Sequence, residues 1–336
     1  MTPSSVPLTE PAIGHVRVGE LSVIVRRGET ILDALRRADV WVPYECGWGS
    51  CGTCKAQLVS GEIRYRSQPS CLRPHDAKLK RIALCQAEPI SPEVVIRPLR
   101  VSDRPDPHLA TVDVHGRLQA RRWITHDLFE LDLELSQPVR YTPGQYALLE
   151  WNGQRRCYSM VDPSGESGTD NLRFLIRLYA SGTLSPVLAT LPIGTEISLQ
   201  VPYGGAYLRP APQYLLIAGG TGIAPLRAII KALDAHHLAS TWLLYGAATP
   251  THLAYAEELA LLLRPDRFLC SVDRPTSHWA GPTGPVTDLL PKVLPSLDTA
   301  AVRCYLAGPP AMVTAAERLL RDAGIGAERI HADAFA

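Results

Sequence analysis

Residues 46–54 read Cys46-Gly-Trp-Gly-Ser-Cys51-Gly-Thr-Cys54, and a fourth cysteine, Cys85, follows 31 residues after Cys54. The glycines let the backbone bend tightly and point N–H groups toward the sulfurs. Two irons bridged by two sulfides need four thiolates, and one such loop can supply three of them. A zinc site is the alternative, but zinc sites usually join two short Cys-x2-Cys hooks, and this sequence has one. The spacing therefore favours a binuclear iron–sulfur cluster.

The residues around this loop predict a small α+β domain. Strands are expected at 15–18, 21–25 and 55–59. Thr30 is expected to cap a helix over residues 30–38, in which Ile31, Leu32, Leu35 and Ala38 fall on one face. In these features residues 14–98 resemble plant-type [2Fe–2S] ferredoxins. The resemblance implies a β-grasp fold with four cluster ligands, which are Cys46, Cys51, Cys54 and Cys85.

The composition places the whole chain among ordinary globular proteins. Its 336 residues carry 34 basic and 33 acidic side chains, and 46% of the residues are hydrophobic. This balance favours neither a nucleic-acid partner nor a membrane partner, and no secretory signal or spanning segment is recognisable. We expect a cytoplasmic protein of several domains. The proline-containing residues 99–108 are the expected linker after the first domain.

Two further segments have different strand patterns. In residues 109–210, apolar and acidic side chains alternate from Phe129 to Leu135, and Asn152-Gly153 separates two strands, which predicts a small antiparallel β-barrel. In residues 211–336, strands alternate with expected helices at 225–236, 255–263, 286–290 and 310–323. This alternation predicts a doubly wound α/β domain with a parallel sheet.

Two tetrapeptides in the predicted barrel, Arg156-Cys157-Tyr158-Ser159 and Gly182-Thr183-Leu184-Ser185, resemble paired motifs of the ferredoxin–NADP reductase superfamily. The resemblance implies FAD. Arg156 would clamp its pyrophosphate, Tyr158 would lie against the ring and Ser159 would bond the nitrogen that receives hydride. The second motif has Ser181 where the family usually has glycine.

The glycine-rich turn from Gly219 to Gly222 follows an apolar strand and precedes Pro225, a pattern typical of dinucleotide binding. Residues 307–312, Ala-Gly-Pro-Pro-Ala-Met, resemble the family's nicotinamide loop, although Ala307 replaces its usual cysteine. The terminal Asp333 and Phe335 resemble a family ending in which the aromatic ring covers the flavin. No basic residue follows Gly246 to receive a 2′-phosphate, so NADH is favoured over NADPH.

The expected site residues fall into three groups. The cluster ligands are the four cysteines named above. Ser159, Asp333 and Phe335 are expected to act in hydride transfer. The residues expected to bind FAD or the nicotinamide are Arg156, Cys157, Tyr158, Ser159, Arg177, Leu178, Gly182, Thr183, Leu184, Ser185, Gly220, Thr221, Gly222, Pro225, Gly246, Gly308, Pro309, Met312 and Phe335.

This order of domains resembles the reductase components of aromatic-ring-hydroxylating Rieske dioxygenases, of the naphthalene and terephthalate types. The resemblance implies an NADH-dependent oxidoreductase that passes single electrons to a terminal oxygenase or an intermediary ferredoxin. A reductase of a soluble di-iron monooxygenase or of a deoxysugar 3-dehydrase system has the same modules. A zinc-stabilised nucleotide sensor is the alternative from another class.

Overall fold

The computed structural model describes residues 11–100 and 109–335. These residues form two compact units that divide between Ala110 and Thr111. Most of the predicted linker, residues 101–108, lies outside the described residues, as do residues 1–10 at the amino terminus. The predicted domain boundaries therefore stay predictions. No helix in the described ranges is long and apolar enough to cross a membrane.

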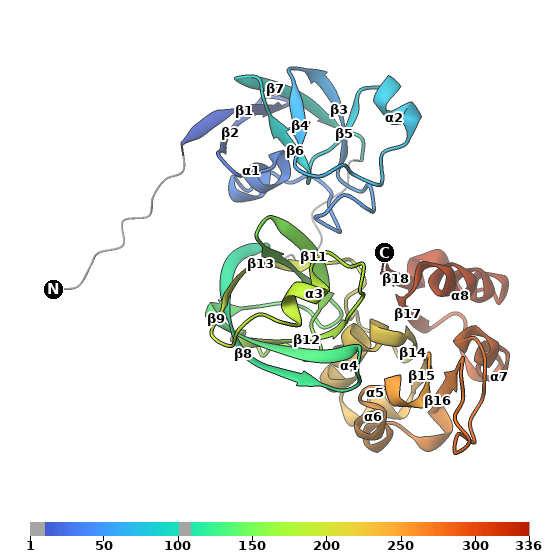
Figure 1. Ribbon diagram of the computed structural model, residues 1–336. Helices are drawn as coiled ribbons and strands as arrows, with labels where there is room; N and C mark the ends of the chain where they lie inside the picture. The colour runs from blue at the N-terminus through green and yellow to red at the C-terminus, as the bar shows by residue number, and fades with distance from the viewer. Residues whose placement is uncertain (1–10, 101–108, 336) are drawn as a thin grey trace. The chain divides into compact units, whose positions relative to one another are not determined.

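The first unit is built on a mixed five-stranded sheet in the order β2-β1-β7-β3-β5 (Figure 1). β1 runs parallel to β7, and the other pairs are antiparallel. The strands are β1 (Ala12–Val18), β2 (Leu21–Arg26), β3 (Lys55–Ser60), β5 (Arg81–Ala83) and β7 (Glu93–Pro98), and β4 (Ile63–Tyr65) pairs separately with β6 (Ala87–Pro89). The helices are α1 (Ile31–Arg37) and α2 (Pro74–Lys78). This arrangement is the expected β-grasp.

α1 begins where the sequence predicted, because Thr30 and Asp33 form a capping box. The Thr30 hydroxyl accepts a hydrogen bond from the Asp33 N–H at 3.2 Å, and the Asp33 carboxylate accepts one from the Thr30 N–H at 3.0 Å. The helix buries Ile31, Leu32 and Leu35 against the sheet. The prediction for Ala38 is wrong, because the helix has ended there and Ala38 is exposed as its C-cap.

The second unit starts with a curled, antiparallel six-stranded sheet in the order β11-β10-β13-β8-β9-β12. Its strands are β8 (Val112–Trp123), β9 (Leu128–Val139), β10 (Tyr146–Trp151), β11 (Gln154–Ser159), β12 (Thr169–Arg177) and β13 (Glu196–Tyr203), and α3 (Ser185–Leu188) lies between the last two. The alternating side chains of β9 pack Leu131 and Leu133 into the core of the sheet. The predicted barrel is confirmed in this curled form.

The same unit continues into a parallel sheet in the order β16-β15-β14-β17-β18. Its strands are β14 (Gln213–Gly219), β15 (Thr241–Ala247), β16 (Phe268–Val272), β17 (Val302–Gly308) and β18 (Ile330–Ala334). The helices are α4 (Ile223–Ala232), α5 (Ala235–Ala239), α6 (Ala256–Leu262), α7 (Leu290–Val293) and α8 (Pro310–Asp322). The strand order reverses direction between β14 and β17, as in a doubly wound fold.

Three expected elements differ in the structure. The helix predicted over 225–236 is two helices, because Leu233 is extended and Asp234 caps α5. The helix predicted at 286–290 is a 3-10 turn, Val286–Leu289, that leads into α7. The terminal residues were given no strand by the sequence, but they form β18 beside β17.

Candidate functional site

The cysteine loop has the backbone that its glycines predict. Gly47, Gly49 and Gly52 have φ of 72°, 95° and 75°, in the region that favours glycine. A side chain at Gly49 would press on Gln86 and Pro69, at 3.0 and 3.2 Å. Of the four cysteines expected to be ligands, Cys46, Cys54 and Cys85 are buried, and Cys51 is exposed. The loop therefore folds tightly and opens to solvent at Cys51.

The four cysteine side chains contact one another in a chain, Cys51 to Cys46 to Cys85 to Cys54. Hydrogen bonds from the Cys51 and Cys85 thiols hold the pKa of Cys46 well below its usual value. A hydrogen bond from Cys85 lowers the pKa of Cys54 in the same way. The same hydrogen bonds raise the pKa of Cys51 and Cys85, so the four thiols form one coupled group.

The contacts among the four cysteines are compatible with the expected binuclear cluster. A binuclear cluster distributes its four thiolates over two irons, and sulfurs in neighbouring pairs fit that requirement.

In the flavin motif, Arg155 and Arg156 lie next to each other on β11 but point to opposite faces of the strand. Arg155 forms an ion pair with Glu150 of the neighbouring strand β10. Arg156 shares its face with Tyr158, and its guanidinium donates to the Arg155 carbonyl oxygen at 2.7 Å. The two arginines therefore have different surroundings in the structure, a difference that could not be predicted from two adjacent arginines in the sequence.

Tyr158 and Ser159 end β11 at the edge of the barrel core. The Tyr158 ring lies edge-on to Phe174, with 6.5 Å between ring centroids, and burial raises the pKa of its hydroxyl. Ser159 is only 7% exposed. Cys157 lies between them and is half-buried.

The second flavin motif forms a closed turn before α3. The Gly182 N–H donates to the Tyr179 carbonyl oxygen at 2.8 Å, and the Ser185 hydroxyl accepts from the Tyr179 N–H at 3.2 Å. A Cβ at Gly182 would lie 2.8 Å from the Ser185 hydroxyl, so the turn has room only for glycine. Arg121 of β8 donates to the carbonyl oxygens of Leu188 and Leu191 at the other end of α3. Thr183 and Leu184 complete the turn, and Leu184 is buried.

Arg177 was expected near the flavin, but its guanidinium pairs with Asp127 at 3.0 Å. The Leu178 N–H also donates to the Asp127 carbonyl oxygen, at 2.8 Å. His252, from the other half of the unit, contacts the Asp127 carboxylate at 2.8 Å. Burial alone would raise the pKa of Asp127, but hydrogen bonds from His252 and Thr125 and the charge of Arg177 lower it to about 2. The sequence contains no signal for Asp127, which lies in a loop, or for His252, which ends a short 3-10 turn, because neither belongs to a motif.

The predicted dinucleotide residues meet at the carboxyl ends of the parallel strands. Gly219 and Gly246 are paired residues of β14 and β15. A Cβ at Gly222 would overlap the Ala307 carbonyl oxygen, and one at Gly219 would lie 2.7 Å from the Met312 sulfur and 2.8 Å from Pro309. The glycine turn and the loop after β17 are therefore packed against each other, where the strand order reverses.

Several other residues of this edge were also placed by the sequence. Gly220 has φ of 57°, Thr221 is half-exposed, and Pro225 lies in the first turn of α4. Gly308 has φ of 146° and packs on the backbone of Gly219. Cys304, three residues before Ala307, packs in the core on the other side of the sheet.

The terminal residues are fixed beside this edge. Asp333 pairs with Ala307 across β17 and β18, and the Phe335 N–H donates to the Gly308 carbonyl oxygen at 2.9 Å. The Phe335 side chain packs on the core that includes Leu128 and Val161 of the barrel. The ending is therefore an ordered strand and not a frayed tail.

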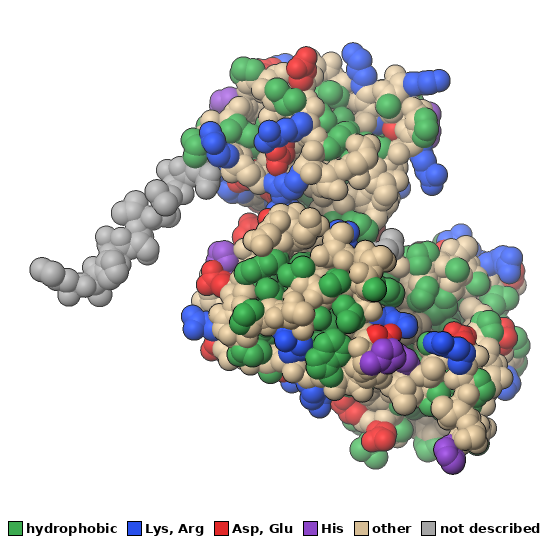
Figure 2. Space-filling view, viewed as in Figure 1, with side chains coloured by type: hydrophobic (Ala, Val, Ile, Leu, Met, Phe, Trp, Pro, Cys, Tyr) green, Lys and Arg blue, Asp and Glu red, His purple; other side chains and the backbone are tan. Residues whose placement is uncertain are grey.

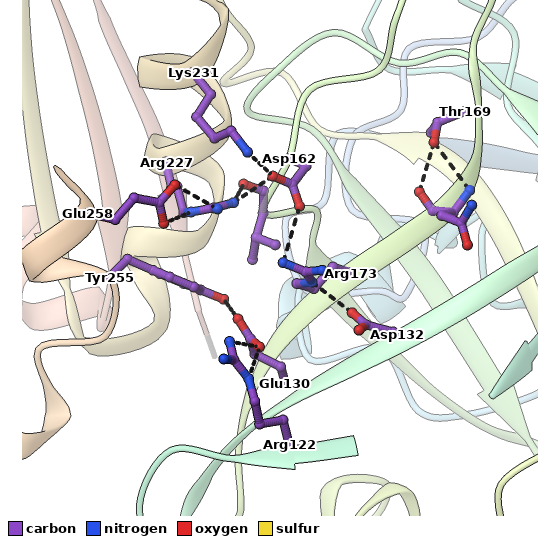
Figure 3. A network of polar contacts seen from close by, with 12 residues as sticks. Arg122, Glu130, Asp132, Asp162, Thr169, Arg173, Arg227, Lys231, Tyr255 and Glu258 are labelled. Atoms are coloured by element: carbon purple, nitrogen blue, oxygen red, sulfur yellow. Dashed lines mark hydrogen bonds and ion pairs between the residues drawn. The ribbon is translucent and has the colours of Figure 1, made fainter. Parts of the chain in front are cut away.

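A buried polar network joins the barrel to the parallel-sheet half, and Figure 3 shows its side chains. Arg227 of α4, 4% exposed, donates to the Val161 carbonyl oxygen and to Asp162, both at 2.7 Å, and pairs with Glu258 of α6 at 2.8 Å. Tyr255 donates to Glu130 of β9 at 2.6 Å. Asp162 follows the flavin motif by three residues and Arg227 follows Pro225 by two, so the network links the two cofactor segments.

Three domain families match the sequence. The 2Fe-2S iron-sulfur cluster binding domain matches residues 16–89, the oxidoreductase FAD-binding domain matches 115–207, and the oxidoreductase NAD-binding domain matches 216–318. The first match decides against the zinc alternative. The chain therefore carries a [2Fe–2S] cluster and FAD and uses a nicotinamide nucleotide.

The chain also resembles characterised proteins over nearly its full length. It is 34% identical to the reductase component of the naphthalene 1,2-dioxygenase/salicylate 5-hydroxylase systems of Ralstonia sp, with 92% of this chain and 94% of the relative covered. It is 31% identical to the naphthalene 1,2-dioxygenase system reductase component of Pseudomonas putida, with 92% and 94% covered. The structure of the ferredoxin reductase in carbazole 1,9a-dioxygenase has a TM-score of 0.82 at 27% identity, with 96% of this chain and 98% of that chain covered. The chain belongs to the family of ferredoxin–NAD(P)+ reductase components of dioxygenase systems.

Proposed function

We propose that this reductase takes hydride from NADH and delivers single electrons to a Rieske-type aromatic-ring oxygenase in the cytoplasm, directly or through a separate ferredoxin. The observation that carries the proposal is the presence, in one chain, of a four-cysteine loop, a flavin motif and a dinucleotide edge. A flavin supplies the conversion of one hydride into two single electrons, which nicotinamide and a [2Fe–2S] cluster cannot exchange directly. The predicted boundaries, 14–98, 109–210 and 211–336, assign one cofactor to each domain.

In the flavin half, we assign the pyrophosphate to Arg156. Arg155 is already neutralised by Glu150, whereas Arg156 lies on the face of β11 that also carries Tyr158. A planar guanidinium bonds phosphate oxygens in pairs. Gly182 lets the turn before α3 close, and Arg121 holds the other end of that helix. We assign Ser159, which is buried at the end of β11, to hydrogen-bond the flavin ring.

In the nicotinamide half, the glycine turn from Gly220 to Gly222 leads directly into α4, and the start of a helix suits a pyrophosphate. Gly308, Pro309 and Met312 close the other side of the same edge. Asp333 and Phe335 lie beside this edge on β18, where we assign them to orient the nicotinamide and to exclude water from the hydride path.

The preference for NADH rests on the loop after β15. Ala247 and Ala248 offer no cation, but the Asp273 and Arg274 N–H groups donate to their carbonyl oxygens, at 3.1 and 2.9 Å. Both an acid and a base therefore lie beside this loop. A carboxylate accepts hydrogen bonds from ribose hydroxyls and repels a 2′-phosphate, so we assign the NADH preference to Asp273.

Reoxidation of the NADH-reduced protein tests the proposed acceptor. Under anaerobic stopped-flow conditions, a Rieske oxygenase, alone or with its ferredoxin, should reoxidise the cluster faster than a di-iron hydroxylase or a deoxysugar 3-dehydrase does. Equal or faster reoxidation by one of the latter two would assign the chain to that system. A protein that binds NADH but reduces no acceptor would support the nucleotide-sensor alternative.

A further inference from the structure

The first unit concentrates positive charge that the rest of the chain lacks. Residues 11–100 carry 14 basic and 9 acidic side chains, whereas residues 111–336 carry 19 basic and 21 acidic ones. Many of the basic groups in the first unit are neutralised locally, such as Arg37 by Glu29 and Arg64 by Glu88. The basic groups without such a partner therefore determine where the surface of this unit is positively charged.

Part of that charge lies on α2 and its flanks. Arg73, Lys78 and Lys80 are exposed, and no carboxylate pairs with any of them in the part of the chain that the structure describes. Leu79 lies between the two lysines and is 48% exposed. We call these four residues the basic face. Figure 2 shows Lys and Arg side chains at the end of the unit where Figure 1 places α2.

The carboxylate of α2 itself does not neutralise this face. Asp76 is fully buried and is bonded by the Lys55 ammonium at 2.8 Å, by the Arg73 N–H at 2.9 Å and by Arg81 at 3.3 Å. These contacts, with Lys55 the strongest, hold the pKa of Asp76 well below its usual range. The negative charge of Asp76 is therefore paired inside the unit with Lys55 and Arg81. It does not neutralise the exposed side chains of the basic face.

The basic face is attached to the cluster loop at two points. Lys55, which pairs with Asp76, directly follows the ligand Cys54, and the Cys71 N–H donates to the Gly49 carbonyl oxygen at 3.0 Å. A partner on this face would therefore lie beside the loop that opens to solvent at Cys51. An exposed apolar side chain with charged neighbours suits a transient interface, in which rim charges steer the partner.

From these observations, and resting on the proposed function, we propose that the basic face docks the acidic surface of the electron-acceptor protein. The one-electron step is oxidation of the reduced cluster and reduction of the acceptor's metal centre, with NADH as the electron source. The chain's own second unit is a poorer occupant. Its acidic excess is only two charges, and a covalent link already supplies a high effective concentration.

Two forms of one haem protein can serve as probes, namely native cytochrome c, which is basic, and succinylated cytochrome c, whose lysines have become carboxylates. The measured quantity is the rate at which NADH reduces cytochrome c through the cluster. It is obtained by subtracting the rate that remains in the Cys85→Ser variant. With the succinylated probe this rate should fall as salt rises from about 10 to about 200 mM, because screening weakens attraction between opposite charges.

Lys78→Gln combined with Lys80→Gln should lower the low-salt rate with the succinylated probe at least about threefold and should flatten its salt dependence. The rate with native cytochrome c should stay equal or rise. Arg26→Gln with Arg27→Gln is the matched control, since it removes two charges at the end of β2, at the opposite edge of the sheet from β5 and α2. This control should change the rate by less than about 1.5-fold.

Three outcomes would overturn the proposal. Equal slowing in both double variants would mean that net charge, and not this face, attracts the acceptor. Unchanged rates in both double variants would show that the basic face has no role in docking. Slower reduction of the cluster by NADH in the lysine variant, seen by stopped flow, would show that the face serves the chain's own second unit. If the unmodified protein reduces ferricyanide but neither cytochrome, the proposed function itself fails, and the docking proposal fails with it.

Discussion

Single glycines define the nicotinamide edge, and they differ in how much the structure depends on them. A Cβ at Gly222 would overlap the Ala307 backbone, whereas one at Gly220 would meet nothing within 4 Å. The sequence predicted both glycines from one motif. It could not rank them, because the obstruction comes from a strand 85 residues away.

We expect Gly222→Ala to raise the KM for NADH at least about tenfold and to lower the melting temperature, since backbone at both ends of the contact must move. Gly220→Ala should lower the free energy of unfolding by only about 1 kcal/mol. The φ of 57° at this position is strained for a residue with a side chain, but no atom obstructs the added Cβ. Steady-state kinetics and thermal unfolding measure both effects. Equal losses in the two variants would contradict the packing described here.

The two adjacent arginines allow a second comparison at this scale. Arg156→Ala should lower the FAD content of the purified protein several-fold, because the clamp on the pyrophosphate is lost. Arg155→Ala should retain FAD, since that side chain pairs with Glu150. Released flavin, measured by fluorescence after denaturation, gives the content. Loss of FAD from Arg155→Ala alone would reverse the assignment.

At the scale of elements, local patterns predicted most strands and helices, but β18 could not be predicted. Its five residues, Ile330 to Ala334, alternate apolar and polar side chains, but two of the three apolar ones are alanines, and the segment becomes a strand because β17 offers an edge. α1 shows the opposite case, because its start is encoded in four consecutive residues from Thr30 to Asp33. Elements whose conformation is determined by their own residues could be predicted, whereas elements that depend on contact with a distant strand could not.

Docking of β18 should depend on pH through His331. Burial, together with the charges of Arg209 and Arg303, lowers the pKa of His331 to about 4, and Arg303 lies 2.9 Å from its Nε2. The unfolded chain takes up this proton near pH 6.5, before the folded protein does. The free energy of unfolding should therefore fall as pH drops from about 6.5 to about 4.

His331→Gln should remove this contribution and reduce the loss of melting temperature between pH 7 and pH 5 by about 2 °C or more. Thermal unfolding of both proteins at the two pH values provides the measurement. An unchanged loss in the variant would show that His331 is not the group responsible.

At the scale of the whole molecule, hydride transfer requires the barrel and the parallel sheet to hold their cofactors in register. The Arg227 network joins them through Asp162, Glu258 and the Val161 carbonyl oxygen (Figure 3). The motifs predicted which segments bind the cofactors. They did not predict this junction, because an arginine in a helix and an aspartate in a loop belong to no recognisable pattern until the fold brings them together.

Arg227→Met should slow flavin reduction by saturating NADH about tenfold while FAD content stays unchanged, because the two cofactor segments are no longer held in fixed positions. Arg122→Met is the control, since Arg122 pairs with Glu130 in the same network but is 69% exposed. Its effect should stay within about twofold. Stopped-flow absorbance measures the rate, and similar losses in both variants would argue against a specific positioning role for Arg227.

The account as a whole depends on electrons from one hydride being divided between a flavin and a cluster in the same chain. Anaerobic titration with NADH, followed by absorbance and by electron paramagnetic resonance, tests this most directly. We expect complete reduction at about 1.5 NADH per chain, two electrons on the flavin and one on the cluster, and about 1 NADH in Cys85→Ser. A titration that ends at one NADH with the native cluster still oxidised would contradict the account.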